Sequence, residues 1–150
     1  MTQAEGAGVA PVAPDLFVLH HIGIVTPRER YADVVAAVIG GLGAELEDEG
    51  EDYELDIQAS WIQVPSGLRL EVVSPKGNAD GPITRFLSKT GGGLHHISFE
   101  TTEIDSCKAL AVSGGARLVG ESEDHAGWAE FFMDPKQTCG ALLHWMQALH

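Results

Sequence analysis

Positive charge is scarce in this sequence. Its 150 residues include 9 Lys and Arg against 22 Asp and Glu, which gives a formal net charge of −13. Nucleic-acid binding needs a basic face that contacts phosphates, so this balance argues against a nucleic-acid partner. A small anionic ligand is not excluded, because a few cations gathered at one place are enough to bind it.

Cysteine and long apolar runs are also scarce. The two cysteines, Cys107 and Cys139, are expected to be reduced thiols of a cytoplasmic protein rather than a disulfide framework. No apolar run approaches the roughly 18 residues of a membrane-spanning helix, so no membrane partner is expected. The first residues lack the cationic start and apolar core of a signal peptide, and their Ala, Gly and Pro content predicts a flexible tail over 1–15.

What the sequence does contain is an internal repeat. The words LHHIGIVT, at 19–26, and LHHISFET, at 94–101, are nearly the same. Each is followed by a helical pattern that ends in glycines and by three further strand-like runs, so the predicted order is βαβββ twice. We therefore predict an α+β fold in a single domain over 16–150. Its two βαβββ modules, at about 16–90 and 91–147, would form a curved cleft.

Four of the predicted strands carry one polar residue opposite a strongly apolar face, because side chains alternate across a strand. These residues are His21, Glu71, His96 and His144. Any one of them alone would more often be solvated or hydrogen-bonded than metal-bound, and we expect this for the adjacent His20 and His95, on the helix side or at the strand start. The four, however, occupy equivalent places in the two repeats. Three imidazoles and one carboxylate suit a divalent ion such as Co, Mn, Zn, Ni or Fe, so we predict a metal site.

Four longer segments carry a resemblance to a known family: LHHIGIVT, LRLEVVSP, GPITRFLSKTGGGLHHISFE and DPKQTCGALLHWMQ. They resemble the vicinal oxygen chelate (glyoxalase/bleomycin resistance/dioxygenase) superfamily, and within it the methylmalonyl-CoA epimerases, over about residues 16–147. The resemblance implies paired βαβββ modules around a metal-holding cleft, and a homodimer. It also implies metal ligands at His21, Glu71 and His96, and at a last-strand glutamate where this sequence has His144.

The replacement at His144 bears on the reaction. In the epimerases the last-strand carboxylate belongs to the metal site and is a candidate for one of two proton-transferring groups. The other candidate is a glutamate that falls near Ser60, but residues 57–64 contain no carboxylate. His144 can serve as a metal ligand or as a catalytic base, since imidazole titrates near neutral pH. Arg69 and Ser60 are the predicted substrate-binding residues.

The leading functional hypothesis is a metal-dependent isomerase that enolises an α-substituted acyl-CoA or a similar carbonyl substrate. Epimerisation requires bases on both faces of the α-carbon, and neither expected carboxylate is present. Two alternatives on the same fold stay open: a glyoxalase-like lyase or ring-cleaving dioxygenase, and a non-catalytic small-molecule binding protein. Binding proteins of this kind typically lose the metal ligands, whereas all four positions here remain competent to bind a metal.

Overall fold

The computed structural model describes residues 12–150, so most of the tail predicted over 1–15 lies outside the described residues. The strands are β1 Val18–Val25, β2 Glu45–Asp52, β3 Ile57–Gln63, β4 Arg69–Pro75, β5 Gly93–Glu100, β6 Leu118–His125, β7 Trp128–Met133 and β8 Leu142–Ala148. The helices are α1 Tyr31–Leu42, α2 Pro82–Thr90 and α3 Ile104–Ser113, with short 3₁₀ turns at Arg28–Arg30 and Pro135–Thr138.

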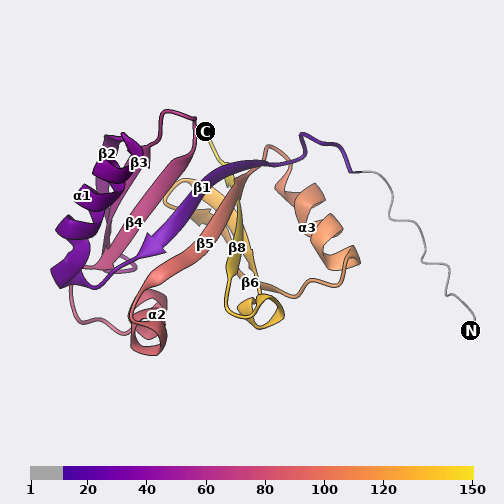
Figure 1. Ribbon diagram of the computed structural model, residues 1–150. Coiled ribbons are helices and arrows are strands. Elements are labelled where there is room, and N and C mark those ends of the chain that lie inside the picture. Colours follow the sequence, from indigo (N-terminus) through magenta and orange to yellow (C-terminus); the bar gives the residue numbers. More distant parts are fainter. Residues whose placement is uncertain (1–11) are drawn as a thin grey trace, which may run out of the picture.

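All eight strands form one sheet, in the order β2-β3-β4-β1-β5-β8-β7-β6 (Figure 1). Each module contributes four neighbouring strands, with one parallel pair in each: β1 with β4, and β5 with β8. The modules meet where β1 and β5 pair antiparallel, at the centre of the sheet. The structure therefore has the predicted α+β fold, with the two βαβββ units side by side.

One face of each half-sheet is covered by a helix. In module one, Ile62, Leu70 and Val72 pack beneath α1, which ends at Gly43 in the left-handed region, with φ 58°. In module two, Phe131 and Trp145 pack beneath α3 in the same way. These are the apolar faces that strand alternation predicts, and their burial removes apolar surface from water on this side of the sheet.

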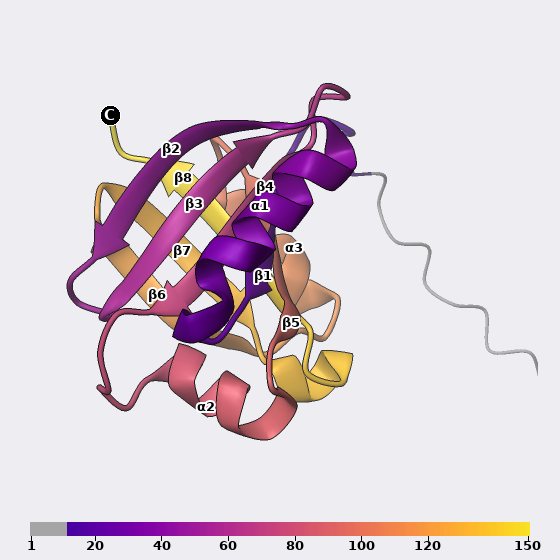
Figure 2. The ribbon, with the colours of Figure 1, turned by 60° about the vertical axis from the view of Figure 1, so that its left-hand side comes forward.

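The opposite face is concave and carries the polar residues. Val72 packs under α1 whereas Val73 packs with Ile83 of α2, so α2 lies on the concave face. Figure 2 shows the sheet curling so that β2 and β3 stand across from β6 and β7. The outermost strands approach so closely that Asp52 of β2 lies 3.0 Å from His125 of β6. The curled sheet therefore turns the polar faces of the two modules toward each other.

Two further expectations concern the cysteines and the membrane. Cys107, on α3, is buried against the sheet and Cys139 is exposed, and both are free thiols. The sulfur of Cys107 lies 3.4 Å from the hydroxyl of Thr101. Among the helices of the described residues, none has both the length and the apolar character needed to cross a membrane.

Candidate metal centre

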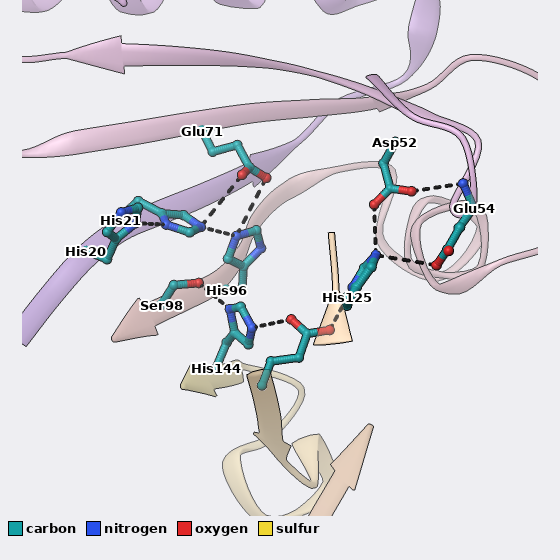
Figure 3. Close-up of polar contacts among 10 residues, drawn as sticks. His20, His21, Asp52, Glu54, Glu71, His96, Ser98, His125 and His144 are labelled. Carbon is teal, nitrogen blue, oxygen red and sulfur yellow. Dashed lines mark hydrogen bonds and ion pairs between the residues drawn. The ribbon is translucent and has the colours of Figure 1, made fainter. Parts of the chain in front are cut away.

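Two histidines and one glutamate meet on the concave face (Figure 3). They come from three neighbouring strands: Glu71 from β4, His21 from β1 and His96 from β5. Nε2 of His21 lies 3.0 Å from Nε2 of His96. The carboxylate oxygens of Glu71 lie 3.7 Å from the His21 nitrogen and 3.8 Å from the His96 nitrogen. Each residue thus points one ligand atom toward the same small space.

Gly23 makes room for this group. It lies on β1, with Glu71 of β4 and His96 of β5 as its partners in the two neighbouring ladders. A Cβ atom at this position would lie 2.0 Å from Cε1 of His96, far inside van der Waals contact. The missing side chain therefore lets the His96 ring lie across β1 toward the other two ligands.

Burial governs the protonation of the three residues. It is the main cause that lowers the pKa of His21 to about 2 and that of His96 to about 3, and neighbouring histidines lower both pKa values further. Burial also raises the pKa of Glu71 to about 7. A metal requires a neutral imidazole, and a buried carboxylate is stabilised by a nearby cation. The donor set is therefore chemically suited to a divalent ion.

The distances between the donor atoms also fit a divalent ion. Two ligand atoms about 2.1 Å from one ion and roughly 90–110° apart are separated by about 3.0–3.4 Å. The 3.0 Å between the nitrogens of His21 and His96 meets this range, and the Glu71 oxygens lie slightly beyond it. Two histidines and one carboxylate leave coordination positions free for substrate or water. These residues fit a catalytic metal site rather than a closed structural one.

Each of the two candidate ligand histidines is supported by the histidine before it. Nδ1 of His20 lies 2.7 Å from Nδ1 of His21, and Nδ1 of His95 lies 2.8 Å from Nδ1 of His96. Such contacts orient the rings and leave Nε2 for the metal. His20 is hydrogen-bonded, as expected, and its ring lies beside the site rather than on the helix side. A β-bulge between Leu19 and His21 brings it beside the ligands.

Arg69 connects this site to β2. Its Nη1 donates to Nε2 of His20 at 2.9 Å, and its Nη2 donates to Glu47 at 2.8 Å. Its Nε is buried and has no hydrogen-bond partner within the described residues. A buried donor without a partner is unfavourable. Arg69, one of the two predicted substrate-binding residues, is held beside the site by His20 and Glu47, and its role in substrate binding stays a prediction.

His144 lies outside the three-residue group. Its Nδ1 lies 2.8 Å from Oγ of Ser98, and its Nε2 donates to Glu130 at 2.7 Å. Ligation by His144 stays a prediction, since the structure does not place its ring nitrogens with the donor atoms of the other three residues. The reason lies in the register of β5 and β8: His144 is opposite Ser98, whereas His96 is opposite Leu142.

Glu130 is a site residue that the sequence analysis missed. It lies on β7, and its two carboxylate oxygens contact His144 and His125, each at 2.7 Å. Alternation along β7 would have placed Glu130 on one face with Trp128 and Phe132. Nothing local to that strand, however, indicates that it lies beside His144.

Ser60 does not reach the cleft, so its predicted role in substrate binding is corrected. Its side chain is fully buried and hydrogen-bonds the hydroxyl of Tyr31 on α1. The reason is strand alternation: Ser60 and Ile62 point toward α1, and Trp61 points the other way. The Trp61 ring packs against His21, with ring centroids 4.7 Å apart. Trp61 is therefore the β3 residue beside the candidate site.

Comparison with known proteins agrees with the fold. The family model for the glyoxalase/bleomycin resistance protein/dioxygenase superfamily matches residues 20–132. An ethylmalonyl-CoA/methylmalonyl-CoA epimerase of Cereibacter sphaeroides is 30% identical over 129 residues, covering 83% of this chain and 93% of the relative. The mitochondrial methylmalonyl-CoA epimerase of Dictyostelium discoideum is 25% identical over 129 residues, covering 83% and 75% of the two chains.

Solved structures share the fold at lower identity. The methylmalonyl-CoA epimerase of Mycobacterium tuberculosis superposes with a TM-score of 0.76 at 22% identity, covering 92% of this chain and 93% of that one. A Streptomyces coelicolor methylmalonyl-CoA epimerase variant in complex with 2-nitronate-propionyl-CoA gives 0.71 at 22% identity, covering 88% and 97%. With the matched family model and the paired βαβββ modules, the chain belongs to the glyoxalase/bleomycin resistance protein/dioxygenase superfamily.

Proposed function

We propose that this protein is a metal-dependent epimerase that enolises an α-substituted acyl-CoA thioester. The observation that carries the proposal is the buried group of His21, Glu71 and His96 on the concave face. The 30% identity to an ethylmalonyl-CoA/methylmalonyl-CoA epimerase supports the choice of substrate class. The reaction is the removal and return of a proton beside a thioester carbonyl.

A divalent ion held by His21, Glu71 and His96 would supply Lewis acidity at the carbonyl oxygen, lowering the pKa of the α-proton and stabilising an enolate. The side chains around it bind and orient the substrate. Trp61 packs against His21 and shields that side of the site from water. Arg69 is held beside His20, and its guanidinium places a positive charge near an anionic oxygen of the acyl group.

His144 is the residue that we assign to one of the two proton transfers. It lies on β8, two residues along the ladder from the partner of His96, and its ring stacks on Phe132 with centroids 4.3 Å apart. It takes the place of the last-strand glutamate that the family resemblance implies. The second transfer has no assigned residue, because β3 carries no carboxylate.

The CoA moiety needs a surface of its own. A pocket of about 610 Å³ opens between α2 and the segment before β8. Its wall includes His95 and Leu142, which are the chain neighbour and the ladder partner of His96. Arg85 and Lys89 of α2 also line it, in a chain with only 9 cationic side chains. This placement favours the pocket as the site of the CoA phosphates.

Charge reversal of this pocket is expected to weaken CoA binding selectively. In the variant with Arg85→Glu and Lys89→Glu, KM for an acyl-CoA should rise on the order of tenfold, because two attractive charges become repulsive ones. The kcat value, and activity on a truncated thioester without phosphates, should change little. The matched control carries Lys108→Glu and Arg117→Glu. An equal rise of KM in the control would assign the effect to overall charge instead.

Metal content and proton exchange test the proposed function directly. Protein purified without chelator should contain about one divalent ion per chain, and Glu71→Ala should lose it, since the substitution removes one of the three donor side chains. The control is Glu45→Ala, at an exposed position of β2. In D₂O, the metal-loaded protein should exchange the α-proton of a 2-substituted malonyl-CoA, and chelation should stop this.

Other outcomes distinguish the remaining hypotheses. Bound metal without exchange on any acyl-CoA would contradict the epimerase proposal and favour the glyoxalase-like or ring-cleaving alternative. Failure to bind any divalent ion would favour a non-catalytic binding protein. The identity of the metal, the homodimer and the cytoplasmic location stay predictions.

A further inference from the structure

A chain of polar side chains crosses the concave face beside the three-residue group (Figure 3). It runs from Ser98 on β5 through His144 on β8, Glu130 on β7 and His125 on β6 to Asp52 on β2. Successive contacts measure 2.8, 2.7, 2.7 and 3.0 Å. The proposed function uses His144 alone, which leaves the other four residues without a role.

This series of polar side chains connects the two edge strands of the sheet. β2 and β6 are the outermost strands, and Asp52 and His125 are their last residues. Glu54, in the turn after β2, lies 3.8 Å from the same ring of His125. The contact between β2 and β6 therefore holds His125 against one carboxylate oxygen of Glu130, while His144 contacts the other oxygen. The carboxylate of Glu130 is held between two imidazoles that come from two different strands.

The charge states of Glu130 and His125 show which ring nitrogens donate the hydrogen bonds. Burial alone would raise the pKa of Glu130, but the hydrogen bonds from His144 and His125 outweigh it and hold this pKa below its usual value. The contact with Glu130, with Asp52 adding to it, raises the pKa of His125 despite partial burial. An ionised carboxylate only accepts hydrogen bonds. Nε2 of His144 and Nδ1 of His125 must therefore carry the protons.

This assignment determines the tautomer of His144. With the proton on Nε2, a neutral ring has its lone pair on Nδ1, the atom that lies 2.8 Å from Oγ of Ser98. A serine hydroxyl can donate to that lone pair and can also accept from a protonated Nδ1. Both protonation states of His144 therefore keep their hydrogen bonds. A group that must take up and release a proton needs this property.

We propose that Glu130 is the positioning residue of His144, and that His125, tied to Asp52 across the sheet edges, holds Glu130 in place. The proposal rests on the proposed function and supplies the carboxylate that the last strand lacks. In the forward step the Cα–H bond breaks and its electron pair stays on the substrate as the enolate. The Ser98 hydroxyl, which lies on the Nδ1 lone pair, takes this proton and passes its own to Nδ1 of His144, and the Glu130 carboxylate stabilises the imidazolium.

The test compares Glu130→Gln with the control Glu123→Gln, at an exposed position of the neighbouring strand β6. A glutamine has one acceptor oxygen for two donating imidazoles, and its amide can donate to Nε2 of His144. Epimerisation by the metal-loaded variant should fall on the order of 100-fold, the size of a general-base contribution. Metal content and thermal stability should stay near those of the control. His125→Gln should give a smaller fall.

Isotope exchange separates positioning from general damage. If His144 serves one face of the α-carbon, each epimer loses its proton to a different group. Glu130→Gln should then suppress exchange from one epimer in D₂O, while the other continues to exchange without inversion. Equal loss of exchange from both epimers, or epimerisation at the wild-type rate, would overturn the proposal.

Ring ¹⁵N chemical shifts give a readout that does not depend on activity. In zinc-loaded wild type, His144 should have a protonated Nε2 and an unprotonated Nδ1, and Glu130→Gln should shift the ring toward the opposite tautomer. An unchanged tautomer in the variant would overturn the positioning role. If the wild type exchanges no proton with any acyl-CoA, the proposed function fails, and these shifts alone then decide whether Glu130 positions His144.

Discussion

Gly23→Ala is expected to abolish tight metal binding. The added Cβ would lie 2.0 Å from Cε1 of His96, so the ring must move away from His21 and Glu71. Loss of one ligand from a three-residue set should weaken divalent-metal affinity by on the order of 100-fold or more, since even outer-shell partners contribute about 10–100-fold. Titration calorimetry with Zn²⁺ and metal analysis of the purified variant measure the effect.

The matched control for this substitution is Gly41→Ala on α1, where nothing lies within 4 Å of the added carbon. Alanine favours a helix over glycine by about 1 kcal/mol, so this control should be slightly stabilised and should bind metal normally. Normal metal affinity in Gly23→Ala would mean that His96 is not a ligand, or that it binds in a different rotamer.

Among the substitutions proposed for this protein, Phe131→Ala is expected to lower the free energy of unfolding the most. The Phe131 ring is fully buried and stacks on Trp145, with centroids 4.8 Å apart and an interplanar angle of 5°. Truncation of a buried phenylalanine typically lowers the free energy of unfolding by about 3–5 kcal/mol, through lost transfer energy and the cavity left behind. Because small domains are stable by only about 5–15 kcal/mol, this variant should be markedly destabilised.

Urea unfolding followed by circular dichroism measures this change, with Tyr53→Ala as the control. Tyr53 is 85% exposed, so its truncation should alter the free energy of unfolding by well under 1 kcal/mol. An effect of Phe131→Ala below about 1 kcal/mol would indicate that the core beneath α3 repacks around the cavity.

Much of the fold and two candidate metal ligands follow from local properties of the chain. The repeated word Leu-His-His-Ile indicates the duplication, and the period of two along a strand places His21 and His96 opposite the apolar faces. These features depend only on neighbouring residues, because a strand that buries one face fixes the direction of every side chain in it. Glu71 on β4 follows from the same alternation.

The rest of the site depends on how distant strands meet. A β-bulge turns the side chain of His20 to the same face as that of His21. The register of β5 and β8 places His144 opposite Ser98 rather than beside His96. The side of β3 that carries Ser60 depends on which of its faces α1 covers. Bulges and register are decided by the pairing and packing of the whole sheet, which no single strand specifies.

The sequence by itself determined the repeat, the helix-facing cores and the positions of His21, Glu71 and His96 along their strands. Only the tertiary structure brought Glu130 to His144 and Asp52 to His125. The last contact joins the two outermost strands, so it exists only because the twist of eight strands accumulates until the edges meet. Curvature of that kind is a sum over the whole sheet, which is why the residues at its edges show no sign of it in their own sequence.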